Sequence, residues 1–125
     1  MMFYKGKVHK IIFESQVNKN NTKNSNNYLA ALYLLCAEKE LWNVAKYKVT
    51  RREINFKAIG CNTLSVYGYT LYKMAQDIYT GSIHLTFRDV CNKYLINDKM
   101  FEIFQTALRI CREGYSFIEF TKTFN

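Results

Sequence analysis

The sequence has no proline and only five glycines among its 125 residues. Proline interrupts helices, and β-sandwiches and barrels need many tight turns, so this scarcity favours helices over an all-β fold. No apolar run approaches the roughly 20 residues that cross a bilayer, and no charged segment followed by an apolar core opens the chain. We therefore expect a cytoplasmic protein with no membrane partner.

Paired metal-binding residues are missing as well. The four cysteines, Cys36, Cys61, Cys91 and Cys111, form no CxxC pair, and the histidines His9 and His84 stand alone. Zinc sites usually contain such a local pair. Cys36 and Cys111 fall on apolar faces of expected helices, so we interpret them as small buried hydrophobic residues in a reducing cytosol. The sequence predicts no metal and no cofactor.

The common catalytic motifs are also absent. The chain contains no GxGxxG, GxxxxGK[ST], GxSxG or HExxH. Glu38 and Glu40 are two residues apart, so they do not share a helix face. One Cys–His arrangement remains as an alternative, in which His84 works with Asp89 or Cys91. An exposed loop histidine is the commoner case, so we predict a protein that is not an enzyme and has no catalytic residue.

Apolar residues recur at helical spacing along most of the chain. This pattern predicts one all-α domain over residues 1–125, a compact bundle of about five or six helices. The expected helices lie at 7–17, 28–47, 54–59, 65–80, 87–94 and 98–113. The segment NKNNTKNSNN at 18–27 predicts a flexible loop in which Asn26 or Asn27 caps the next helix. The end, YSFIEFTKTFN, predicts a short C-terminal strand or arm.

The spacing also predicts which side of each helix is buried. In the first helix, Val8, Ile11 and Ile12 share one side. The helix that begins at Tyr28 is apolar over a wide face and should be central. Near the end, Phe101, Phe104, Leu108 and Cys111 recur at i, i+3, i+7 and i+10. Six tyrosines lie off these stripes and are candidates for a partner surface: Tyr4, Tyr33, Tyr47, Tyr69, Tyr72 and Tyr115.

Positive charge is plentiful and unevenly placed. The net charge is +8, and residues 1–57 carry 11 bases against 4 acids. A basic stretch with interleaved aromatic residues runs over 46–57, and suits phosphates and bases or an acidic groove on a protein. A solvated surface turn is the alternative. If Thr50 and Glu53 form a capping box, Arg51 and Arg52 lie at a helix N-terminus, where the helix dipole disfavours cations. This cost has no evident benefit for the fold, so it favours a binding role for the two arginines. The predicted partner-binding residues are Lys46, Tyr47, Lys48, Arg51, Arg52, Phe56 and Lys57.

Four stretches resemble small uncharacterised proteins of phages and prophages of low-GC Gram-positive bacteria. They are Phe3-Tyr4 with His9, YLAALYLLCAEKELW, YTLYKMAQDIYTG and FQTALRICREGY. The resemblance is one of pattern and spacing and contains no catalytic signature. It implies a protein that binds and redirects or inhibits a host component, defence nucleases such as CRISPR effectors among them.

Together these observations predict a non-enzymatic, stoichiometric binding protein of the host cytosol, in the form of an anti-defence, anti-CRISPR-like inhibitor. Its partner would be a host protein or nucleoprotein with an acidic surface. A DNA- or RNA-binding module that uses the basic 46–57 region is the alternative, and homodimer formation remains open.

Overall fold

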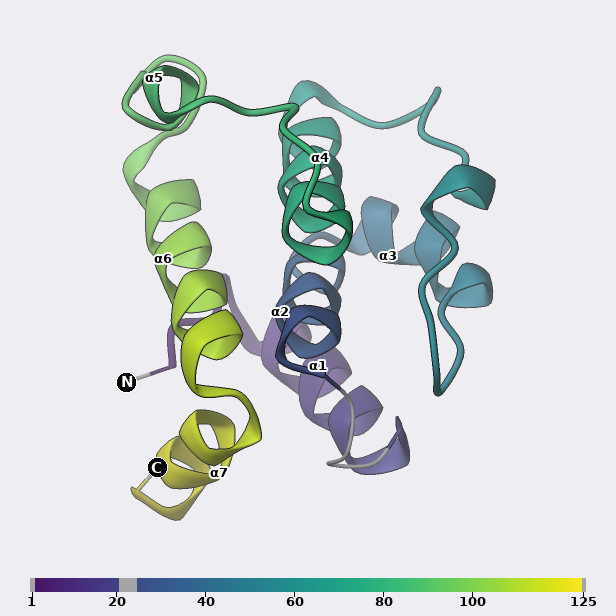
Figure 1. Ribbon diagram of the computed structural model, residues 1–125, viewed down its shortest axis with the longest axis vertical. Coiled ribbons are helices and arrows are strands. Elements are labelled where there is room, and N and C mark those ends of the chain that lie inside the picture. Colours follow the sequence, from purple (N-terminus) through teal and green to yellow (C-terminus); the bar gives the residue numbers. More distant parts are fainter. Residues whose placement is uncertain (1, 21–24, 125) are drawn as a thin grey trace.

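A computed structural model of the chain describes residues 2–20 and 25–124. Seven α-helices and two 3₁₀ turns make up this part of the chain (Figure 1). Their bounds are α1 Lys7–Asn20, α2 Asn26–Leu35, α3 Lys39–Ala45, η1 Lys46–Lys48, η2 Phe56–Ala58, α4 Val66–Thr80, α5 Phe87–Val90, α6 Asp98–Glu113 and α7 Tyr115–Phe124. The predicted all-α class is confirmed. None of the described helices is both long and apolar enough to cross a membrane.

Helix α2 forms the centre of the molecule. Every residue from Tyr28 to Leu35 is buried, which is the pattern of a helix surrounded on all sides. Its most extensive contacts are with α4 and α6, and α1 and α3 also pack on it. Figure 1 shows α6 along one edge of the molecule and the segment after α3 along the opposite edge. The prediction of a central helix at this position is confirmed.

Local hydrogen bonds fix the helix ends. The hydroxyl oxygen of Ser65 accepts from the N–H of Gly68 at the start of α4, and the side chain of Asn97 accepts from Met100 at the start of α6. Gly81, with φ of 76°, ends α4 in the left-handed region that favours glycine. These caps follow from short motifs that the sequence contains. At α2, however, Ser25 is the cap instead of Asn26 or Asn27.

The predicted buried side of α1 is wrong. Val8 and Ile11 are 57% and 65% exposed, whereas His9, Phe13 and Val17 are buried at i, i+4 and i+8. The reason is that His9 belongs to the core. Its ring stacks on Tyr33 with 4.6 Å between centroids, and Phe13 packs edge-on against the same tyrosine. A search for apolar residues at helical spacing does not count histidine as a core residue, so it predicts the wrong buried side here.

The predicted face of α6 is shifted by one residue. The core side consists of Met100, Ile103, Ala107 and Ile110, which have the same i, i+3, i+7, i+10 spacing as the predicted stripe. Phe101 and Leu108 are instead 40% and 42% exposed, and Phe104 and Cys111 are half-buried. Cys36 is buried as predicted, but Cys111 only in part. Among the six tyrosines, Tyr33 and Tyr72 are buried, so neither is available to a partner.

Three local predictions also differ from the structure. The expected C-terminal strand or arm is helix α7, whose Phe117 and Ile118 are buried. The expected loop at 18–27 overlaps two helices, because α1 continues to Asn20 and α2 begins at Asn26. Its residues 21–24 lie outside the described part of the chain. The expected helix at 54–59 is an isolated bridge between Val49 and Ile54 followed by the η2 turn.

Candidate functional site

The basic stretch forms one wall of a groove at the edge of the molecule opposite α6. The groove has a volume of about 630 Å³. We call it the cationic groove, and define it by the nine residues that line it: Gln16, Lys19, Trp42, Lys46, Tyr47, Val49, Thr50, Arg51 and Arg52. They come from the C-terminal part of α1, from α3 and η1, and from the turn that follows. The groove thus joins segments that are far apart in the sequence.

A tight turn, rather than a helix N-terminus, carries Arg51 and Arg52. The N–H of Thr50 donates to the carbonyl oxygen of Glu53 over 2.9 Å, and the Thr50 hydroxyl oxygen accepts from the N–H groups of Arg52 and Glu53. Below the turn, the N–H of Asn55 donates to the carbonyl oxygen of Lys48. The capping box expected at Thr50 and Glu53 is therefore wrong, because both residues close a hairpin-like turn.

Two tyrosine hydroxyls, from a buried and a half-buried side chain, bind the backbone of this turn. Tyr28 of α2 donates to the carbonyl oxygen of Thr50 over 2.6 Å. The hydroxyl oxygen of Tyr79 of α4 accepts from the N–H of Ile54 over 3.2 Å. Trp42 is buried beside the groove on α3. The guanidinium groups are exposed, and the backbone that bears them is held on both sides by hydrogen bonds.

The charge within the groove has a single sign. Lys19, Lys46, Arg51 and Arg52 line it, and no acidic residue is among its lining residues. The Lys46 ammonium lies 5.1 Å from the centroid of the Tyr47 ring, which is 78% exposed. Unpaired cations around a concave surface concentrate the positive potential there. The groove is suited to bind an anionic group against a partly aromatic wall.

The residues that line the groove lack several side chains that are common in active sites. Neither histidine, cysteine nor carboxylate is among the residues that line the groove. Throughout the described part of the chain, no group of three or more His, Cys, Asp or Glu residues has the geometry to hold a metal ion.

The structure brings together four of the seven predicted partner-binding residues: Lys46, Tyr47, Arg51 and Arg52. Lys48 and Lys57 are exposed but lie outside the groove. Phe56 is a wrong prediction, because it is 4% exposed and packs against the rings of Tyr72 and Tyr79. Sequence reasoning missed Lys19 and Trp42, which reach the groove through packing and belong to no local motif.

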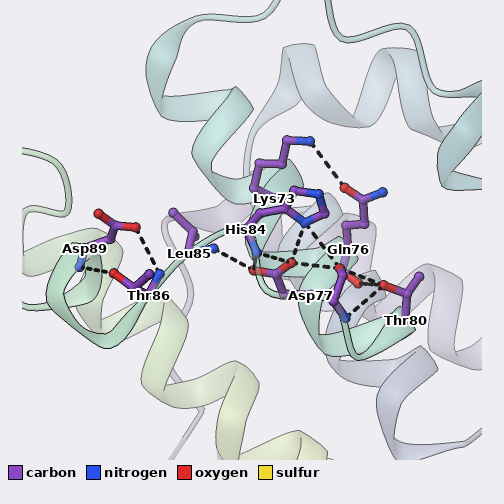
Figure 2. Close-up of polar contacts among 9 residues, drawn as sticks. Lys73, Gln76, Asp77, Thr80, His84, Leu85, Thr86 and Asp89 are labelled. Carbon is purple, nitrogen blue, oxygen red and sulfur yellow. Dashed lines mark hydrogen bonds and ion pairs between the residues drawn. The ribbon is translucent and has the colours of Figure 1, made fainter.

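The alternative site at His84 is a local hydrogen-bond network around Asp77 at the end of α4 (Figure 2). The Asp77 carboxylate accepts from the backbone N–H groups of His84 and Leu85 and from the Ser82 hydroxyl, at 2.8–2.9 Å. Nδ1 of His84 lies 2.6 Å from the same carboxylate. Burial raises the pKa of Asp77, but the hydrogen bonds from Leu85, His84 and Ser82 outweigh it, so the pKa lies below its ordinary value.

This geometry does not form a relay between a nucleophile and a base. In a Ser–His–Asp triad the serine and the carboxylate bind opposite nitrogens of the ring. Here Ser82 and Asp77 both contact Nδ1, with Ser82 at 3.2 Å. Asp89 is engaged elsewhere, in a capping box with Thr86. The described contacts join His84 to neither Asp89 nor Cys91, in contrast to the alternative that the sequence left open.

His9 is a buried residue whose two ring nitrogens are both hydrogen-bonded. The N–H of Lys5 donates to Nδ1 over 3.0 Å, so Nδ1 carries no proton and Nε2 donates to the carbonyl oxygen of Tyr33 over 2.9 Å. Burial, with the charge of Lys5, lowers the pKa of His9 to about 4, although the bond to Tyr33 opposes this. The imidazole is therefore a neutral core residue that links α1 to α2.

Comparison with protein-family models, with curated proteins and with solved structures finds no match to this chain.

Proposed function

We propose that this chain is a non-enzymatic binding protein that acts stoichiometrically, by docking a polyanionic surface of a protein or nucleoprotein into the cationic groove. The observation that carries the proposal is the groove itself, in which four basic side chains and two aromatic ones surround a concave surface of about 630 Å³. Such a field speeds association with acidic partners, and aromatic side chains with arginine supply the anchors that interfaces favour.

A protein or nucleoprotein partner is favoured over free DNA or RNA by the distribution of charge. A duplex-binding protein usually presents a long basic stripe or a helix with outward bases that enters a groove. Here the four cations gather in one groove, and α6, the longest of the described helices, exposes Glu102 and Glu113 beside Arg109 and Arg112. Compact positive charge of this kind fits a local cluster of carboxylates or phosphates on a folded partner.

The resemblance to phage and prophage proteins suggests the biological form of this activity. In that form the protein works in the cytosol of a host bacterium and occupies the surface of a host component, as an anti-defence, anti-CRISPR-like inhibitor does. Occupation needs no catalytic group, which agrees with the chemistry of the groove residues. The target is specified only by its chemistry, a surface rich in anionic groups.

Affinity capture with matched baits tests the proposal. The baits are the wild type, R51E/R52E in the groove, and R88E/K93E, which makes the same change in net charge at exposed positions on and after α5. We expect a host component that the wild type and R88E/K93E retain in a one-to-one ratio and R51E/R52E loses. Equal retention by all three baits would remove the groove from the function.

Nuclease treatment and oligonucleotide titration separate the two kinds of partner. Capture that survives nuclease treatment, with no binding of single- or double-stranded DNA or RNA at low salt, supports a protein surface. Tight oligonucleotide binding that falls steeply with salt would instead establish the nucleic-acid module.

A further inference from the structure

Helix α6 carries a row of exposed polar residues whose charges are ordered by sign along the helix. Because an α-helix turns 100° per residue, positions 98, 102, 105, 109 and 112 fall on one side of it. All five side chains on this row are exposed. We call the row the ordered stripe, and its members in sequence are Asp98, Glu102, Gln105, Arg109 and Arg112. Two acids occupy its N-terminal half, an amide its centre, and two arginines its C-terminal half.

Apolar side chains flank this stripe and are left uncovered. Phe101 and Leu108 lie one helical position to the side and are 40% and 42% exposed. A shallow hollow of about 560 Å³ runs along the same face, with Glu102, Leu108 and Arg112 among the residues that line it. Neither Glu102 nor Arg112 takes part in an ion pair within the described chain. The face thus combines apolar area with two charged side chains, Glu102 and Arg112, that have no ion-pair partner within the described chain.

We propose that this face of α6 is a self-association surface, on which α6 of a second copy packs in the antiparallel direction. A two-fold axis near Gln105 places the acidic end of one stripe against the arginine end of the other, at both ends of the interface. This is the self-complementarity that a two-fold interface requires. A parallel arrangement would bring acid against acid and arginine against arginine. The inference does not depend on the proposed function.

The position of α6 leaves the rest of the molecule free for other partners. Helix α6 lies at one edge, and the residues after α3 that line the cationic groove lie at the opposite edge (Figure 1). Pairing through α6 therefore keeps both grooves open. Arg109 is already oriented on this face, because its Nε lies 2.5 Å from Glu113 and its guanidinium group lies over the Phe117 ring. Arg112 and Glu102 are consequently the better positions for substitution.

Sedimentation equilibrium of the wild type and of two charge reversals tests the surface. We expect a concentration-dependent dimer for the wild type, and dimerisation weakened at least about tenfold by E102R and by R112E, since each places like charges opposite each other at both ends. The R112E result is diagnostic. That change lowers the net charge from +8 to +6, which by general repulsion alone would strengthen association. The control K99E, on α6 but outside the stripe, should dimerise as the wild type does.

A mixing experiment tests the antiparallel direction. Because an axis near Gln105 sets position 98 against position 112, D98R and R112E are complementary variants. Each homodimer would place like charges opposite each other, whereas the mixture pairs opposite charges at both ends, so it should form a heterodimer more tightly than either variant forms a homodimer. This recovery also shows that both variants are folded. A wild type that stays monomeric at every concentration, single variants that dimerise normally, or a mixture without recovery would each overturn the proposal.

Discussion

The hydroxyl group of Tyr28 donates a hydrogen bond to the carbonyl oxygen of Thr50, with 2.6 Å between the two oxygens. Tyr28 belongs to the buried central helix, and Thr50 begins the turn that carries Arg51 and Arg52. The bond therefore links the buried central helix to the turn that contributes two arginines to the cationic groove. A turn held in this way loses less conformational entropy when a partner binds than a free loop would.

The substitution Tyr28→Phe removes this bond and keeps the ring. We expect the free energy of unfolding to fall by about 1 kcal/mol, the usual value of one such hydrogen bond. Binding of a polyglutamate peptide should weaken several-fold, because the turn is less fixed. Tyr72→Phe is the matched control, since the Tyr72 hydroxyl donates to the Phe56 carbonyl oxygen away from the groove. Denaturant titration should show a similar loss of unfolding free energy in both variants. Fluorescence titration should show weaker peptide binding in Y28F alone. Equal binding losses would contradict this role of Tyr28.

His9 should make stability depend on pH. Its pKa is lowered to about 4 in the fold from an ordinary 6.5, chiefly by burial, so the unfolded chain binds a proton that the folded chain resists. The contribution is complete above about pH 6.5 and is lost as the pH falls toward 4, by about 3 kcal/mol in total. Denaturant titrations between pH 7 and pH 4 should show a steeper decline for the wild type than for H9Q. The same slope in both proteins would rule out a buried neutral histidine.

Gly114 should tolerate no side chain. Its φ is 71° and ψ is −152°, a conformation that is nearly restricted to glycine, and an added Cβ would lie 2.3 Å from the side-chain oxygen of Asn26. We expect Gly114→Ala to lower the free energy of unfolding by about 2 kcal/mol. Gly60→Ala is the control, because an added Cβ there meets nothing within 4 Å. Thermal denaturation that ranks the two variants equally would contradict the geometry of the α6–α7 junction.

Asp77 should hold the segment after α4 in place. Asp77→Ala removes the acceptor for the amides of His84 and Leu85 and for the Ser82 hydroxyl, which we expect to cost about 2 kcal/mol of unfolding free energy. Hydrogen exchange should show the two amides losing protection while the amides in the middle of α4 keep theirs. Unchanged exchange at His84 and Leu85 would show that the carboxylate does not organise this segment.

The helices and several of their ends could be predicted because their causes are local. Ser65, Gly81 and Asn97 act on groups within four residues, so a short window of sequence contains the whole interaction. The buried faces were harder to predict. In α1 a hydrogen-bonded histidine takes a core position, and in α6 two adjacent stripes have the same apolar spacing. Only packing against α2 decides which of the two is buried.

The residues of the candidate site also differ in how far the sequence predicts them. Lys46, Arg51 and Arg52 are close in sequence, so their clustering is visible without a structure. Lys19 joins them because the end of α1 packs near the turn, and no local pattern indicates this. Phe56 is interleaved with the bases in sequence, yet the turn folds it against Tyr72 and Tyr79. Sequence order shows which residues are neighbours but not which side of a turn faces solvent.

The most direct test of the account is a fluorescence titration of a labelled polyglutamate peptide with wild type, R51E/R52E and R88E/K93E at two salt concentrations. We predict binding by the wild type that weakens with salt, a loss of at least about tenfold in R51E/R52E, equivalent to about 1.4 kcal/mol, and near-wild-type affinity in R88E/K93E. Equal losses in the two variants would show that only net charge matters. Either that result or the absence of any binding by the wild type would contradict a function based on the cationic groove.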